Sequence, residues 1–237
     1  QAVAASRSGG SVYMIGRVGS DDFGPQLIAD LNVAGVNTSG VGVSNTNSGI
    51  AIITIDDSSQ NQIIQVLGAN NTCGDPESIR IGELIETSST LLLQLEVSID
   101  LSLAAAKMAH NHGKTVILDP SPVRPFPEDM YHYCSVITPN ETDAEALVGF
   151  AVTDLASAER AAMTLMSRGV PNVIIKLGEH GALYANTYDR GHVPAFNVSA
   201  IDSVGAGDAF NGALAVALSE DLSLRDATRF ASAAGAL

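Results

Sequence analysis

The feature that most constrains the fold is an alternation of short apolar runs with Ala-rich, amphipathic runs along the whole chain. The apolar runs are rich in Val, Ile and Leu and predict strands buried on both faces, while the segments between them predict helices. Strands that are joined through helices form a parallel sheet covered on both sides. We therefore expect a single α/β domain over residues 1–237, a three-layer sandwich around a central, mostly parallel sheet.

The positions of these elements follow from their flanking turns and caps. The expected strands are Val12–Ile15, Thr90–Leu95, Thr115–Leu118, Ser135–Thr138 and Val173–Leu177, with a short hairpin around Ala182–His192. The expected helices are Pro25–Ala34, Pro76–Glu86, Ile99–His112, Glu141–Val148, Leu155–Arg168, Asp208–Ser219 and Ser223–Leu237. Both ends resemble interrupted helices, so we expect the chain to be part of a longer protein and to lack both termini.

A small β lid is expected between residues 41 and 66. Three β-rich runs lie there, and the polar residues 56–61 separate the last two as in a hairpin. The expected lid strands are Val41–Val43, Ile50–Ile55 and Gln62–Val66.

The charge of the chain disfavours several classes of partner. Its formal net charge is −14, with three lysines, and such a surface repels nucleic acid and anionic membranes. We find no apolar run long enough for a membrane span and no signal peptide before the first strand. We therefore expect a cytoplasmic protein that binds neither nucleic acid nor membrane. Any bound phosphate must be held mainly by backbone amides and metal ions.

The strongest chemical signal is D-S-V-G-A-G-D-A-F-N-G at residues 202–212. A short glycine loop, 205–207, leads directly into a helix whose first turn carries Asp208, and loop amides at a helix N-terminus form an anion site. An aspartate there competes with a phosphate unless it removes a proton from a hydroxyl while the amides stabilise the phosphoryl group. Simple capping of the helix is the alternative role for Asp208.

Two other glycine motifs are disfavoured. The sequence contains no G-x-x-x-x-G-K-[ST], and the glycines at 205 and 207 lack the third glycine of a dinucleotide fingerprint. A P-loop nucleoside triphosphatase and a Rossmann dehydrogenase are therefore poor candidates.

The 202–212 motif resembles the C-terminal signature of the ribokinase-like (PfkB) carbohydrate kinases. Other segments resemble that family in the same order along the whole chain: Q-A-V-A-A-S-R-S-G at 1–9, G-A-N at 68–70, Q-L-E at 94–96, D-P-S-P at 119–122, I-T-P-N-E-T-D at 137–143 and K-L-G-E-H-G at 176–181. The Q-L-E and T-P-N-E-T segments favour the ribokinases within the family.

The resemblance implies a reaction and its cofactors. The reaction is transfer of the γ-phosphoryl group of ATP to a sugar hydroxyl, with D-ribose giving ribose 5-phosphate. Mg²⁺ accompanies ATP, K⁺ activates, and a homodimer forms through the lid. Two alternatives stay open: a sister kinase for fructose, another sugar or a nucleoside, and a catalytically inactive relative that binds sugar or nucleotide.

The resemblance also assigns roles to residues. Asp208 is the catalytic base and a sugar ligand, and Glu96 accepts hydrogen bonds from sugar hydroxyls. The anion hole is formed by Gly205, Ala206 and Gly207. The nucleotide-binding residues are Asn140, Lys176, Leu177, Gly178, Glu179, His180, Gly181, Gly207, Asp208 and Ser232. Asp143 contacts Mg²⁺ through water and is one methylene shorter than the family's glutamate. Asp202 and Val204 hold the monovalent cation.

Overall fold

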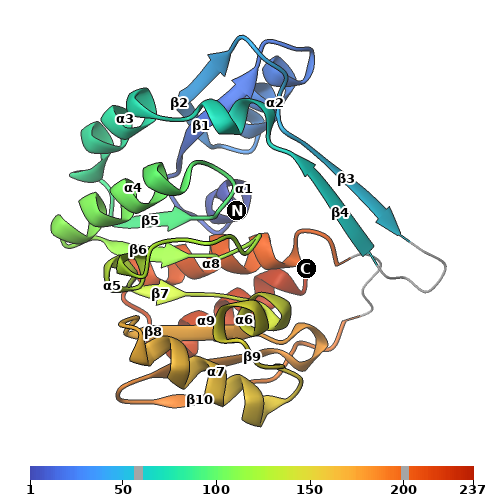
Figure 1. The fold of residues 1–237 in the computed structure, drawn as a ribbon, viewed down its shortest axis with the longest axis vertical. Helices are drawn as coiled ribbons and strands as arrows, with labels where there is room; N and C mark the ends of the chain where they lie inside the picture. The colour runs from blue at the N-terminus through green and yellow to red at the C-terminus, as the bar shows by residue number, and fades with distance from the viewer. Residues whose placement is uncertain (56–60, 199–202) are drawn as a thin grey trace.

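Six strands form the central sheet, in the order β10–β9–β8–β7–β6–β5 (Figure 1). The computed structural model describes residues 1–55, 61–198 and 203–237. The strands of this sheet are β5 (Thr90–Leu93), β6 (Thr115–Leu118), β7 (Val136–Ile137), β8 (Asn172–Lys176), β9 (Ala182–Asn186) and β10 (Arg190–Val193). Strands β5 to β8 are parallel, whereas β9 and β10 are antiparallel to their neighbours. The predicted mostly parallel sheet is confirmed.

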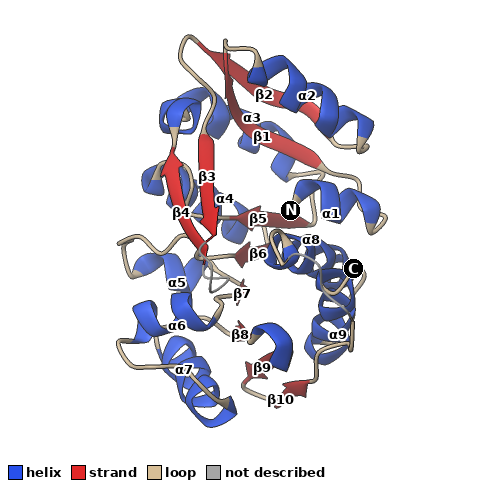
Figure 2. Cartoon of the chain, turned by 90° about the vertical axis from the view of Figure 1, so that its right-hand side faces the viewer, coloured by secondary structure: helices blue, strands red, loops and turns tan. Residues whose placement is uncertain are grey.

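Helices cover both faces of this sheet, which gives three layers (Figure 2). One face carries α1 (Ala2–Arg7), α8 (Ala206–Ser219) and α9 (Leu224–Gly235). The opposite face carries α4 (Ile99–Asn111), α5 (Asp129–Tyr133), α6 (Glu141–Val148) and α7 (Leu155–Ser167). The remaining helices are α2 (Phe23–Val33) and α3 (Asp75–Ile85), with 3₁₀ turns at Gly68–Thr72 and Gly178–His180.

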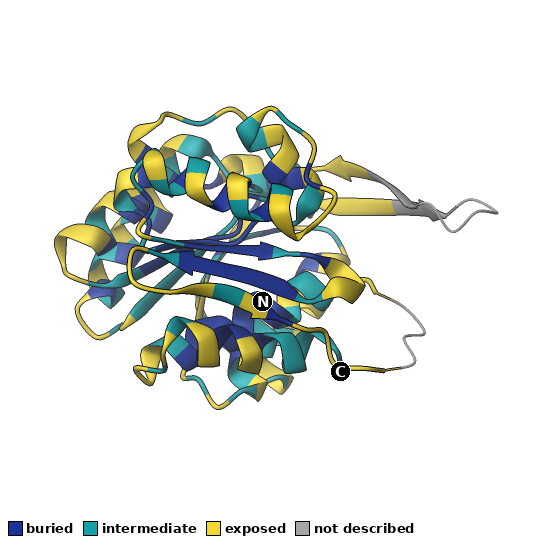
Figure 3. Ribbon diagram, turned by 90° about the horizontal axis from the view of Figure 1, so that it is seen from below, coloured by how far each residue is buried: buried dark blue, intermediate teal, exposed yellow. Residues whose placement is uncertain are grey.

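The core is divided by the sheet, because successive strand residues point to opposite faces. On β8, Val173 and Ile175 join the cluster under α4 to α7, and Ile174 joins the cluster under α8 and α9. All three side chains are fully buried. Figure 3 shows the sheet as a buried layer between partly exposed helices. The sheet is therefore buried on both faces, as its apolar sequence predicts.

The expected place of one lid strand is wrong. Residues 41–43 belong to β2 (Asn37–Ser44), which pairs in parallel with β1 (Tyr13–Gly19) through a crossover that contains α2. The strand has the two-residue period of a β-strand, and this period does not specify a partner. Residues 41–43 were expected in the lid because they are close to the hairpin in the sequence. The strand with which they pair is β1, which comes before α2.

The predicted hairpin is confirmed between residues 50 and 66, and its role as a lid stays a prediction. Strand β3 (Ile50–Ile55) pairs with β4 (Asn61–Val66) in antiparallel orientation. The hairpin projects from the body of the molecule (Figures 1 and 3).

Two further findings concern the helices. Helix α5 follows the Pro-rich segment 120–127 and was not expected from the sequence, because its five residues are too few to show a helical period. Across residues 1–55, 61–198 and 203–237, no helix combines the length and apolar character needed to cross a membrane.

Candidate active site

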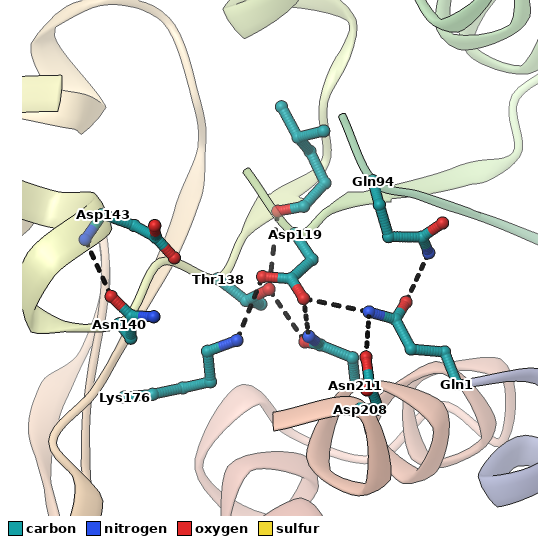
Figure 4. Close-up of polar contacts among 10 residues, drawn as sticks. Gln1, Gln94, Asp119, Thr138, Asn140, Asp143, Lys176, Asp208 and Asn211 are labelled. Carbon is teal, nitrogen blue, oxygen red and sulfur yellow. Dashed lines mark hydrogen bonds and ion pairs between the residues drawn. The ribbon is translucent and has the colours of Figure 1, made fainter. Parts of the chain in front are cut away.

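Polar side chains gather at the carboxyl ends of the four parallel strands, where an open α/β sheet binds ligands (Figure 4). Gln94 follows β5, Asp119 follows β6, Asn140 follows β7, and Lys176 ends β8. Asp208 reaches the same place from the first turn of α8. The sheet and one helix therefore bring together residues that lie more than a hundred positions apart in the sequence.

Asp208 is the third residue of α8, and Gly205 precedes the helix with φ +82°. Its carboxylate oxygen Oδ1 accepts a hydrogen bond from the Gln1 side-chain amide, with 3.0 Å between Nε2 and Oδ1. The N-cap residue, Gly205, makes no side-chain capping bond to α8. Among the described residues, the hydrogen bond to the Asp208 carboxylate comes from Gln1, outside the helix, which favours a role other than a simple helix cap.

Asp119 is the centre of a buried polar network, with 4% of its surface exposed. Its Oδ2 accepts from Asn211 at 2.7 Å and from Gln1 at 2.9 Å, and its Oδ1 lies 3.0 Å from the ammonium nitrogen of Lys176. Asn211 in turn accepts a hydrogen bond from the hydroxyl of Thr138. Burial raises the pKa of Asp119, and the positive charge of Lys176 opposes that rise. The network therefore fixes an ionic pair beneath the site.

Lys176 lies beside the predicted anion hole. Its side chain is 13% exposed, and a Cβ atom added at Gly207 would lie 3.5 Å from its ammonium nitrogen. The expected cation next to the glycine loop is thus present, although its nearest partner is Asp119. An ammonium group held there contributes positive charge where an anion would approach the loop.

Asn140 and Asp143 occupy the start of α6. The Asn140 side chain accepts from the Asp143 backbone N–H at 2.7 Å, which is the N-cap arrangement expected for this pair. Asp143 is buried, and among the described residues its Oδ2 has no hydrogen-bond partner. Burial, followed by the negative charge of Asp119, raises the pKa of Asp143 to about 6. A buried carboxylate oxygen without a partner fits a divalent cation or the water bound to one.

Glu96 lies under the lid. The Gln65 side chain of β4 donates a hydrogen bond to Glu96 Oε1 at 2.8 Å. This contact links the lid to the end of β5. Glu96 is partly exposed, so its carboxylate can accept hydrogen bonds from a ligand between the lid and the sheet.

The predicted nucleotide turn at 176–181 requires glycine at its end. Gly181 has φ +89°, and a Cβ atom there would lie 2.1 Å from the Val193 carbonyl oxygen. Leu177 is buried in the core, so it can offer a ligand only its backbone. Glu179 and His180 are exposed and line a pocket of about 750 Å³.

The remaining predicted site residues are Ser232, Val204 and Asp202. Ser232 is on α9, and its hydroxyl donates to the Thr228 carbonyl oxygen at 2.9 Å. Val204 is 54% exposed just before the glycine loop, and Asp202 lies outside the described residues.

Sequence reasoning did not assign functional roles to Asp119, Gln1 or Asn211. Asp119 directly follows an apolar strand, and that position is a usable signal because ligands bind at carboxyl ends of strands. Asn211 lies within the 202–212 motif, and its part in the site becomes visible only through its hydrogen bond to Asp119. Gln1 carries no local signal, since both carboxylates that it contacts are more than a hundred residues away.

Comparison with known proteins identifies the class of this molecule. The model of the pfkB family of carbohydrate kinases matches residues 1–237. The chain belongs to this family and is a carbohydrate kinase.

Individual relatives share most of their length with this chain. It is 36% identical over 238 residues to a ribokinase of Haemophilus influenzae, covering 100% of this chain and 78% of that protein. It is 37% identical over 217 residues to a deoxyribokinase of Salmonella typhi, covering 91% of this chain and 71% of that protein. The structure of Arabidopsis thaliana ribokinase, complexed with ribose and ATP, superposes with a TM-score of 0.89 at 29% identity, covering 100% of this chain and 78% of that one.

Proposed function

We propose that this protein transfers the γ-phosphoryl group of ATP to a hydroxyl of D-ribose and forms ribose 5-phosphate. The observation that carries the proposal is the Asp208 carboxylate, held beside the glycine loop in the first turn of α8. The ribokinase of H. influenzae and the Arabidopsis ribokinase bound to ribose and ATP support the choice of substrates. We also propose that residues 1–237 act as one kinase domain.

Asp208 acts as the general base in this reaction. Its carboxylate accepts the proton of the sugar hydroxyl as the hydroxyl oxygen forms a bond to the γ-phosphorus. The bond from that phosphorus to the β–γ bridging oxygen breaks, and ADP leaves. Backbone amides of Gly205, Ala206 and Gly207, with the Lys176 ammonium nearby, stabilise the negative charge on the phosphoryl oxygens.

The nucleotide is held by the turn at 176–181, with Asn140 and Ser232 as further contacts. The free Oδ2 of Asp143 is suited to hold Mg²⁺ through water, and this cation would neutralise phosphate charge when it is bound with ATP. A monovalent cation at Asp202 and Val204 would hold the glycine loop in position. We therefore expect faster turnover in potassium buffer than in matched sodium buffer, and equal rates would remove this site.

Glu96 and the lid hold the sugar. Glu96 accepts hydrogen bonds from sugar hydroxyls, and Gln65 keeps its carboxylate under the lid. A lid that covers the sugar excludes water, so transfer to the sugar is favoured over hydrolysis of ATP.

We further propose that two copies of the protein pair through the lid. The cross-strand pairs Ile50–Val66 and Ile52–Ile64 share one face of the hairpin, and all four side chains are between 42% and 57% exposed. Gln65 points from the other face toward Glu96. The outer apolar face is therefore free to bury itself against a second copy of the lid.

A second candidate substrate is 2-deoxy-D-ribose. The deoxyribokinase of S. typhi, at 37% identity, favours it specifically. The two pentoses differ by one hydroxyl, and a site built to hydrogen-bond that hydroxyl discriminates strongly against a sugar that lacks it.

A sugar panel tests the proposal. ADP formation by the full-length protein is measured with ribose, deoxyribose, fructose and a nucleoside as acceptors, with an acceptor-free control. We expect the highest kcat/KM with ribose. The highest value with deoxyribose would transfer the assignment to the second candidate, and acceptor-independent rates with every compound would reject kinase activity.

A further inference from the structure

Helix α1 packs unusually close to α8, and Gly212 makes this possible. A Cβ atom added at Gly212 would lie 2.4 Å from the Gln1 carbonyl oxygen and 2.6 Å from both the Ala4 Cβ and the Ala5 nitrogen. No side chain fits in such a space without a backbone shift. Gly212 lies one turn after Asp208, so the start of α1 is held directly beside the catalytic turn.

This packing places the Gln1 side chain between two carboxylates. Its amide nitrogen donates to Asp119 Oδ2 at 2.9 Å and to Asp208 Oδ1 at 3.0 Å, while its amide oxygen accepts from Gln94 (Figure 4). Ionised carboxylates only accept hydrogen bonds, so the NH₂ group of Gln1 must face them. Both donors and the acceptor of this carboxamide are thus used, and its orientation is determined.

The two carboxylates differ in burial and in the number of their hydrogen-bond partners. Asp119 is 4% exposed and is also held by Asn211 at 2.7 Å and Lys176 at 3.0 Å. Asp208 is exposed at the start of its helix. Among the described residues, Gln1 supplies the one hydrogen bond that reaches the Asp208 side chain. Gln1 therefore connects the exposed Asp208 carboxylate to the buried Asp119 carboxylate, which has further partners of its own.

We propose that Gln1 is a positioning residue for Asp208. Its amide bond to Oδ1 restricts the rotation of the Asp208 side chain and directs Oδ2 toward the sugar hydroxyl. It also donates to both carboxylates, which offsets part of the repulsion between them. A general base works only within hydrogen-bond reach of its proton, so fixing the carboxylate raises kcat without contact to substrate. This inference rests on the proposed role of Asp208.

The test uses two substitutions of Gln1 in the full-length protein. Gln1→Met keeps the size of the side chain and removes both donors, and we expect kcat to fall by about 10- to 100-fold. The KM values for sugar and ATP should stay within about threefold, because a positioning residue acts through Asp208 and not through a contact with substrate. Gln26→Met is the matched control, since Gln26 donates to Asp30 on the exposed face of α2.

Gln1→Glu replaces the donor with a charge that faces Asp119 and Asp208, while Lys176 lies beyond Asp119. We expect a larger loss of kcat than for Gln1→Met. The loss relative to the parent should shrink as pH falls from about 8 to about 6, because the charges of Asp119 and Asp208 raise the pKa of the introduced glutamate and its protonated form again has a donor. Gly212→Ala should also lower kcat, since it pushes α1 away from α8.

The outcomes separate this inference from the function on which it rests. An Asp208→Asn variant with parental activity rejects the proposed function itself. An inactive Asp208→Asn variant beside a Gln1→Met variant with parental kcat overturns the positioning role alone. Thermal melts monitor folding. If Gln1→Met does not fold, a Gln1→Glu deficit that stays constant with pH overturns the proposal.

Discussion

Two regions of the site differ in how their side chains are held. The floor consists of Asp119 with its partners Gln1, Lys176 and Asn211, and the lid is the hairpin of β3 and β4. On the floor, Asp119 is buried with three side-chain partners that all come from the same chain. On the lid, Ile52 and Ile64 lie 51% exposed on the outer face of the hairpin. A satisfied buried network is rigid, whereas an exposed apolar face gains stability only when something covers it. The floor therefore holds its polar groups in place without a ligand, and we expect the lid to gain stability from a ligand or a partner.

The largest effect on stability is expected from breaking the ion pair of the floor. Lys176→Met leaves the buried Asp119 carboxylate without its cation, so we expect unfolding free energy at neutral pH to fall by about 3–5 kcal/mol. The loss should shrink in acid, where Asp119 is protonated. Chemical denaturation measures both effects. The control Lys107→Met alters an exposed lysine on α4 and should change stability by less than about 0.5 kcal/mol. A similar change for both variants would show that the floor is not a fixed network.

A substitution of Asp143 should change the free energy of unfolding in the opposite direction. Its pKa is raised to about 6, so its ionised form is disfavoured in the folded protein, and stability falls as pH rises from about 4 to above 6. Asp143→Asn removes this cost, and we expect it to be more stable than the parent by about 2–3 kcal/mol at pH 7 and equally stable near pH 4. Denaturation without nucleotide or metal tests this, with the exposed Asp100→Asn as control. Equal stability of variant and parent at pH 7 would contradict it.

A substitution of Glu96 tests the contact between the sheet and the lid, because Glu96 follows β5 and accepts from Gln65 of β4. Glu96→Gln removes a charged acceptor from the proposed sugar site, and we expect the sugar KM to rise by about 10- to 100-fold with little change in the ATP KM. Steady-state kinetics in both substrates provide the measurement, and the exposed Glu145→Gln on α6 is the control. A raised ATP KM with an unchanged sugar KM would place Glu96 in the nucleotide half.

The smallest effect on the stability of the monomer is expected on the outer face of the lid. Ile52→Lys alters a side chain that is already half exposed, so the monomer should lose less than about 0.5 kcal/mol. The same change places charge in the proposed dimer contact and should shift sedimentation from dimer to monomer. Ile79→Lys, on α3 and 65% exposed, is the control that should leave the oligomeric state unchanged. Identical sedimentation of parent and Ile52→Lys would exclude pairing through this face.

Local signals predicted most of the elements. The strand Thr115–Leu118 and the helix Glu141–Val148 were expected with the bounds that the structure shows, because periodicity and caps are local properties. The wrong partner for residues 41–43 arose from strand pairing, which depends on tertiary packing. In the site, the glycine loop predicted the position of Asp208. The connection from Gln1 to Asp119 spans 118 positions and arises only when α1 packs against Gly212.

The central claim is that Asp208 is the base that deprotonates the sugar, and one comparison tests it most directly. Asp208→Asn keeps the size of the side chain and removes its proton-accepting charge. Single-turnover phosphorylation of ribose and equilibrium ATP binding are measured for parent and variant under the same conditions. The rate of phosphoryl transfer should fall by about 10²- to 10⁴-fold, while the ATP dissociation constant changes by less than about threefold. A variant that transfers phosphate within about tenfold of the parent rate would contradict the claim.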